Sequence, residues 1–131
     1  MTTTSFTKAR HADTFILSEA NGLRSRDNIT ILSGSGVVKA GTVVGKQTSG
    51  GKWEPSPAAA TSDSGGSEYA KGITIYEADA TSADAAVAAI RRDAEVNMHL
   101  LTYDSSVLTT GNIDTKNAEL ATCGIFVRRS A

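Results

Sequence analysis

Short apolar runs with a period of two residues, separated by glycine-rich turns, recur along most of the chain. Within residues 27–32, Ile29 and Ile31 alternate with polar neighbours, and Ile73 and Ile75 show the same spacing further along. Alternation of this kind is typical of strands with one buried face. The pattern therefore predicts a mainly β protein with little helix.

The segment 85–104 gives a mixed signal. Its alanines favour helix, whereas Val96 alternates with polar neighbours in the manner of a strand. We expect two strands joined by a turn near residues 92–93, which places His99 on the outer face of the second strand.

One helix is predicted near the C-terminus. Ile113, Leu120 and Ala121 have helical spacing, Asp114 is a suitable N-cap, and Gly124 is a suitable residue for ending the helix. The predicted helix has about two turns, which is too short to be stable without packing against the rest of the protein. A final strand is expected after it.

The stretch from Gly34 to Pro55, GSGVVKAGTVVGKQTSGGKWEP, allows a phosphate-binding loop or a bent β-ribbon. A phosphate-binding loop needs four residues between its first glycine and the Gly-Lys step, followed by Ser or Thr. Here Gly41 and Gly45 are separated by three residues, and Gln47 follows the lysine. Because glycine inside a strand pattern indicates a bulge or a sharp bend, we expect a bent ribbon.

The two segments poorest in apolar residues are 1–12 and 55–68. Residues 1–12 are mostly Thr, Ser, Lys, Arg and His, so they bury too little apolar area to fold alone. We expect a flexible arm at 1–12, a compact domain at 13–131, and a mobile loop at 55–68. Two interpretations of the arm stay open: a frayed terminus, or a segment that becomes a strand against a partner.

Composition narrows the class of protein. The chain has 131 residues and a net charge of −1, without the basic excess of a general nucleic-acid binder. The doublets Arg91-Arg92 and Arg128-Arg129 are interpreted as solvated surface charge. Its single cysteine excludes an intrachain disulfide and is consistent with a reducing compartment. We expect no membrane span and no secretory signal.

The sequence offers no assembly of catalytic groups. His11 and His99 are far apart and have no second ligand at metal-binding spacing, and Cys123 has no identifiable base partner. The carboxylates Glu77, Asp79 and Asp84 fall in a turn-rich stretch and are interpreted as solvated. We therefore expect no enzyme activity, no metal and no cofactor.

The order of segments resembles a known family. LRSRDNITILSGSGVVKAGTVVGK, KGITIYEADA, RDAEVNMHLL and the closing GIFV follow one another as in the head decoration proteins of tailed bacteriophages, such as the lambda type. The resemblance runs from about Arg24 to Arg128. Its most specific parts are residues 24–27, residues 36–45 and Gly124-Ile125, and their order carries more weight than any one of them.

This resemblance implies a fold and a role. The fold is a compact single domain built on a bent ribbon, the β-clip, and it is trimeric. The role is capsid decoration without enzyme activity, with a homotrimer seated on the major capsid protein at threefold and local threefold positions of the expanded head. The implied location is the outer surface of the virion, after assembly in the host cytoplasm, with no direct contact to nucleic acid or membrane.

The resemblance also assigns the candidate residues. An N-terminal arm that orders on the capsid implies a binding segment made of Thr3, Thr4, Ser5, Phe6, Thr7, Lys8 and Arg10. The bent ribbon implies structural turns or bends at Gly36, Gly41, Gly45 and Gly124. The alternative is a ligand-binding or nucleotide-hydrolase-like module on a similar β-clip, although we find no carboxylate–metal–phosphate site for it.

Overall fold

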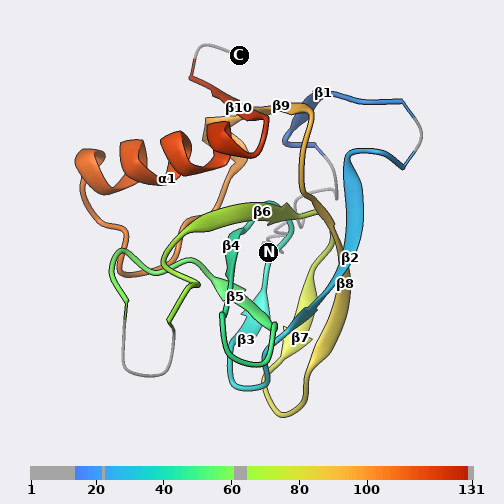
Figure 1. Ribbon diagram of the computed structural model, residues 1–131, viewed down its shortest axis with the longest axis vertical. Helices are drawn as coiled ribbons and strands as arrows, with labels where there is room; N and C mark the ends of the chain where they lie inside the picture. The colour runs from blue at the N-terminus through green and yellow to red at the C-terminus, as the bar shows by residue number, and fades with distance from the viewer. Residues whose placement is uncertain (1–13, 22, 61–64, 130–131) are drawn as a thin grey trace, which may run out of the picture.

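The strands wrap around one closed barrel, and a smaller sheet lies at each end of it (Figure 1). The computed structural model describes residues 14–21, 23–60 and 65–129. Its elements are β1 (Ile16–Glu19), β2 (Arg26–Ile31), β3 (Gly36–Val38), β4 (Val43–Lys46), β5 (Trp53–Pro55), β6 (Ala70–Thr74), β7 (Ala78–Ala80), β8 (Ala85–Ile90), β9 (Ala94–Asn97), η1 (Met98–Leu100), α1 (Thr110–Thr122) and β10 (Ile125–Arg128).

The barrel consists of five strands in the order β2-β5-β4-β6-β8. The antiparallel pair β2–β8 is its longest seam, with Arg26 opposite Ile90 and Ile31 opposite Ala85. A single parallel pair, Ile31 with Trp53, joins β2 to β5 and closes the ring. The alternating isoleucines of β2 point into the barrel because their polar neighbours face solvent.

Two apolar cores hold the chain together. The first fills the barrel and is closed at the lower end by β3 and β7, which pair only with each other among the described strands (Figure 1). Its buried residues are Ile29, Ile31, Val38, Val44, Trp53, Ala78, Ala80, Val87 and Ala89. Small and β-branched side chains dominate this core, as expected from a chain that is only 5% aromatic.

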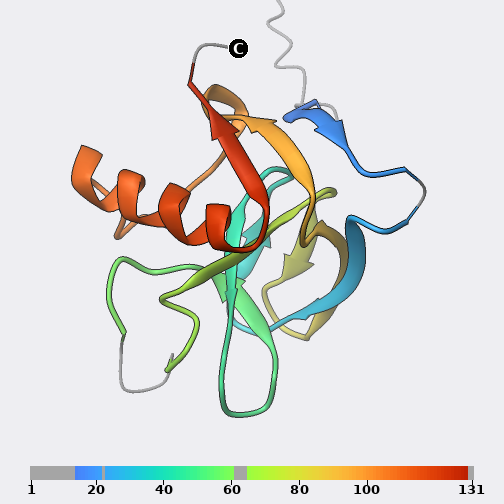
Figure 2. The same ribbon diagram turned by 45° about the horizontal axis from the view of Figure 1, so that its top comes forward.

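The second core lies between the barrel and a layer formed by α1 and the sheet β1-β9-β10 (Figure 2). Its buried members are Phe15, Val43, Ala70, Ile73, Ile75, Ile90, Ala94, Val96, Leu101, Leu120 and Ile125. Because β4, β6 and β8 contribute to both cores or to the seam between them, barrel and upper layer fold as one domain. The prediction of a mainly β single domain with little helix is confirmed.

The helix differs from its prediction in length and in its N-cap. It has 13 residues, and Thr109 rather than Asp114 caps it by accepting a hydrogen bond from the Asn112 backbone N–H. The weak helix formers Gly111 and Asn112 hid the first turn from a pattern-based prediction. Asp114 is instead paired with Arg129.

The predicted pair of strands around residues 92–93 is confirmed as β8 and β9, but β9 ends at Asn97. The next three residues form the 3-10 helix η1, because the Asn97 side chain accepts a hydrogen bond from the His99 backbone N–H and turns the chain. The placement of His99 on a strand was therefore wrong.

The ribbon 36–55 runs as β3, β4 and β5, with the β4–β5 hairpin turning at residues 47–52. The described parts of the 55–68 segment are fixed at both ends. Ser56 and Ser67 are buried, and the Ser56 hydroxyl donates to the Ser67 carbonyl at 2.8 Å. The expected loop is thus tied to the barrel at its base.

Candidate functional site

The predicted capsid-binding residues Thr3, Thr4, Ser5, Phe6, Thr7, Lys8 and Arg10 lie outside the described residues. The structure does show where this segment joins the fold. Phe15 is fully buried in the second core, and its carbonyl accepts a hydrogen bond from the Asn97 backbone N–H at 2.8 Å. The chain therefore leaves the domain from a fixed point beside the edge strand β1.

Three of the four predicted bend glycines have a positive φ angle. Gly36 begins β3 at +77°, Gly41 lies between β3 and β4 at +83°, and Gly124 follows the helix at +82°. Gly124 is in the position where helices often end on a left-handed residue. Gly45 has no such angle and lies at an irregularity in the β4–β6 pairing.

Gly41 lies at a junction of backbone hydrogen bonds. Its N–H donates to the Thr74 carbonyl at 2.7 Å, and its carbonyl accepts from the Thr102 N–H at 2.8 Å. The positive φ at this point lets β3 turn into β4 while both bonds are kept.

Replacing Gly41 with valine is expected to lower the free energy of unfolding by roughly 1–3 kcal/mol, since a β-branched residue is strained at positive φ. Urea denaturation followed by circular dichroism measures the change. An unchanged transition midpoint would count against a bend that requires glycine.

The motif Arg24-Ser25-Arg26-Asp27 forms two linked polar clusters at the start of β2. In the first, Glu19 of β1 accepts hydrogen bonds from the Ser25 hydroxyl at 2.5 Å and from Arg26 Nε at 3.0 Å. The hydrogen bond from Arg26 is the main reason that the pKa of Glu19 is lowered, while partial burial opposes the shift and Ser25 adds to it. This cluster fixes the β1–β2 connection to the barrel.

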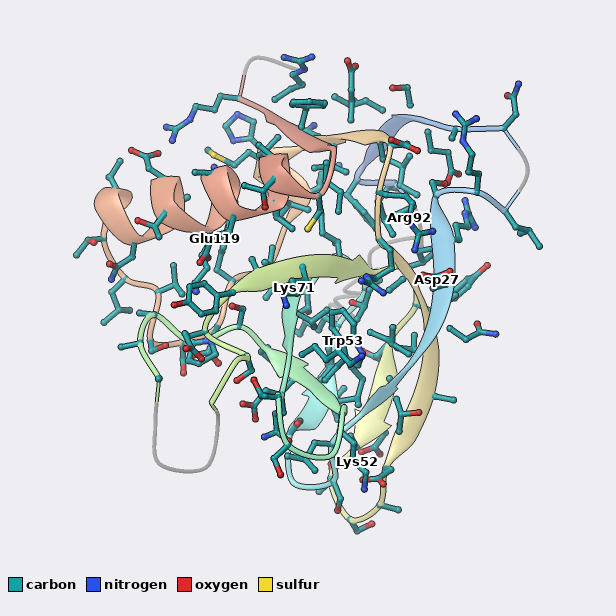
Figure 3. The ribbon with its side chains drawn as sticks, in the orientation of Figure 1. Asp27, Lys52, Trp53, Lys71, Arg92 and Glu119 are labelled. Atoms are coloured by element: carbon teal, nitrogen blue, oxygen red, sulfur yellow. The ribbon has the colours of Figure 1, made fainter. Side chains whose placement is uncertain are left out.

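In the second cluster, Asp27 binds the two arginines of the β8–β9 turn. Arg92 contacts the Asp27 carboxylate directly, and Arg91 lies 3.4 Å from it (Figure 3). The hydrogen bond from Arg92 is the main cause of the lowered pKa of Asp27. Arg91 also lies over the Trp53 ring, 4.6 Å from its centroid. The Arg91-Arg92 doublet is thus a structural tie and not simply solvated charge.

Lowering the pH is expected to weaken these two ties. The folded-state pKa of Glu19 and of Asp27 lies below the unfolded values of about 4.3 and 3.9. Their contribution to stability is therefore complete above pH 5 and is lost as the pH falls through the folded-state pKa values. Thermal melting between pH 6 and pH 3 should show a decline that is shallower in Asp27→Asn. Parallel declines in both proteins would contradict this assignment.

The second arginine doublet is also paired. Arg128 binds Glu95 at 2.9 Å, and Arg129 binds Asp114 on α1. These pairs join β10 to β9 and to the helix. Because all four residues are largely exposed, we expect each pair to add little to stability.

A buried lysine on α1 escaped the sequence analysis. Lys116 is only 1% exposed, and its ammonium group donates to the Glu68 carbonyl and lies 3.4 Å from the Glu119 carboxylate. Glu119 in turn accepts a hydrogen bond from the Ala70 N–H at 3.2 Å. These bonds attach the helix to β6 and to the segment before it. Helical spacing alone placed apolar residues there, and no sequence signal marked the lysine as buried.

Removing this lysine is expected to be costly. Lys116→Ala should lower the free energy of unfolding by about 3 kcal/mol, because it leaves Glu119 without its cation and opens a cavity. Lys116→Met, which keeps the apolar stem, should lose less. Lys71→Ala on exposed β6 surface is the control and should stay within about 0.5 kcal/mol of the parent. Equal stabilities for all three variants would contradict this role.

The remaining candidate groups do not converge. Asp79 lies in β7, where its carboxylate accepts hydrogen bonds from Thr81, and Asp84 binds Lys52 at 2.6 Å. His99 Nε2 is 2.7 Å from the Arg129 carbonyl oxygen, and Cys123 is half-buried at the helix C-terminus. In the described part of the chain, no three His, Cys, Asp or Glu side chains are placed to hold a metal ion.

The glycine-rich ribbon therefore belongs to the barrel wall, and the most specific sequence motifs are structural ties. Comparison with protein families identifies what this arrangement belongs to. The sequence model of the bacteriophage lambda head decoration protein D matches residues 5–125. The chain belongs to this head decoration family. A search of curated proteins gave no match.

Membership in the head decoration family supports capsid decoration as the general role and the phage capsid as the site of action. The family is structural, in agreement with the expectation from the sequence that the chain is not an enzyme. No helix within residues 14–21, 23–60 and 65–129 has the length and hydropathy needed to cross a membrane.

Proposed function

We propose that the protein binds as a homotrimer to the major capsid protein at threefold and local threefold positions of the expanded phage head. There it stabilises the outer surface of the shell against the pressure of packaged DNA. The observation that carries this proposal is the family match over residues 5–125, which spans nearly the whole domain and part of the arm. Assembly takes place in the host cytoplasm, without direct contact to nucleic acid or membrane.

Exposed apolar side chains support an assembly of more than one copy. A single domain of this size leaves seven large apolar side chains exposed among the described residues: Leu17, Leu23, Val37, Tyr69, Tyr76, Leu108 and Phe126. A closed ring of three copies matches the symmetry of a threefold site and buries part of this surface. Three linked copies also bind a lattice more tightly than one, because the second and third contacts form at high effective concentration.

The chain divides into a binding arm at 1–12 and a domain at 13–131. In this proposal the arm residues Thr3 to Arg10 become an extended strand against the capsid protein, as their threonines and Phe6 favour. The fixed attachment of Phe15 beside β1 supports this division, because it gives the arm a rigid point of departure.

Cosedimentation with heads that lack decoration protein tests the proposal. Purified protein is mixed with expanded heads and, separately, with unexpanded proheads. We expect saturable binding to expanded heads only, and a mass of three chains of 13.6 kDa by light scattering for the bound species after release. Equal binding to both particles, or none to either, would contradict the proposed site.

A further inference from the structure

The sheet β1-β9-β10 has an outer face that no described element covers. Along β10, Ile125 and Val127 point into the second core, so Phe126 and Arg128 point outward. Phe126 is paired with Glu95 of β9, which in turn is paired with Ser18 of β1. The helix α1 packs on the opposite, inner side through Leu120.

Two apolar side chains stand on this outer face. Phe126 is 48% exposed and Leu17 is 45% exposed. The register of β1 against β9 is shifted between Ile16 and Ser18, so Leu17 turns toward solvent with Ser18 while Ile16 stays against the core. The irregularity therefore adds a second apolar group to the face.

The charges on this face neutralise each other. Arg128 binds Glu95 at 2.9 Å, and its guanidinium carbon lies 5.8 Å from the centroid of the Phe126 ring. Covering a neutral pair costs less desolvation than covering a lone charge. An aromatic ring, an aliphatic side chain and an arginine together are the residue types enriched at the centres of protein interfaces.

The position of the chain outside the described domain indicates what covers the face. Residues 1–13 join the fold at Thr14, two residues before the edge strand β1 of this sheet. The Phe15 carbonyl is bonded to the Asn97 N–H of β9, so the point of departure cannot move away from the sheet. Twelve extended residues reach at most about 40 Å. A partner that grips this arm is therefore drawn against this end of the molecule.

The opposite end of the molecule lacks this connection. Val37 of β3 is 55% exposed, similar to Phe126, but β3 and β7 lie at the other end of the barrel from β1, β9 and β10 (Figure 1). The two ends therefore offer matched apolar side chains, only one of which is next to the arm.

We propose that the outer face of β1-β9-β10, centred on Phe126 and Leu17, is a second contact with the major capsid protein, next to the arm. This inference rests on the proposed function. The arm holds the capsid protein by strand pairing, and the face covers a neighbouring apolar part of the same capsid surface.

The test compares Phe126→Ser with Val37→Ser in cosedimentation with expanded heads, using full-length protein. Phe126→Ser is expected to weaken binding roughly tenfold or more, because an exposed aromatic anchor is lost in each of three linked copies. Val37→Ser is expected to bind like the parent. Melting temperature and light-scattering mass of the free variants verify that both keep the parent's fold and assembly state. If Phe126→Ser does not fold, Phe126→Leu and Leu17→Ser take its place.

The outcomes separate this inference from the proposed function. If the intact protein fails to bind, the proposed function fails and the capsid contact with it. If the intact protein binds and Phe126→Ser binds equally well, only the second contact is overturned. If Phe126→Ser loses its assembly state, the face lies between copies of this chain, which also overturns the inference. Faster hydrogen exchange in β10 after removal of residues 2–12 from the free protein would assign the face to the arm instead.

Discussion

Gly45→Ala is expected to destabilise the protein by about 3–5 kcal/mol, a large part of the stability of a typical domain. A Cβ atom at position 45 would lie 2.0 Å from the carbonyl oxygen of Ser67 and 2.7 Å from that of Tyr69. Both neighbours are backbone atoms, so the clash cannot be relieved by rotating a side chain. The hydrogen bonds that hold Ser67 in place, from Ser56 and to Glu54, would be strained with it.

Chemical denaturation of Gly45→Ala against the parent measures this effect. Gly111→Ala is the matched control, because its nearest contact is a side-chain atom at 3.9 Å and it lies in the first turn of α1. That change should be neutral or stabilise by up to about 1 kcal/mol through helix propensity. A Gly45→Ala variant as stable as the Gly111→Ala control would show that β4 and the 66–69 segment do not approach as closely as described.

Removing residues 2–12 is expected to abolish detectable binding to expanded heads while the domain stays folded. The described domain begins with Thr14, and its first anchor is Phe15, so the deletion removes no residue of either core. The loss should exceed that of any single contact, because all three copies in a trimer lose their arms together.

The same cosedimentation assay measures the truncated protein beside the intact protein. A variant in which Lys8 and Arg10 are both changed to glutamine is the control for charge, since it keeps the length of the arm. We expect that control to retain part of the binding if strand pairing dominates. Full binding by the truncated protein would assign capsid attachment to the domain alone.

Much of the strand layout follows from residue periodicity, because inward and outward positions alternate along each strand. Ile29 and Ile31 in β2 and Val96 in β9 were placed correctly for this reason. Gly41 and Gly124 carried a local signal, since positive φ is a property of the residue itself. What periodicity could not supply was the partner of each strand, and so the closure of the barrel through Ile31 and Trp53 was not predicted.

The polar ties were also beyond the sequence pattern. Asp27 and Arg92 are 65 positions apart, and Lys116 and Glu68 are 48 apart. A lysine in a helix is normally interpreted as exposed, and an arginine doublet as surface charge. Only the tertiary arrangement shows that they join separate elements. The family match adds the role, because neither core nor tie indicates capsid binding by itself.

A reconstruction of expanded heads saturated with this protein tests the central claim most directly. We expect added density on the outer surface at threefold and local threefold positions, with three barrels around each axis and each barrel's β1-β9-β10 end toward the shell. Density at another lattice position, or single copies without threefold contacts, would contradict the account.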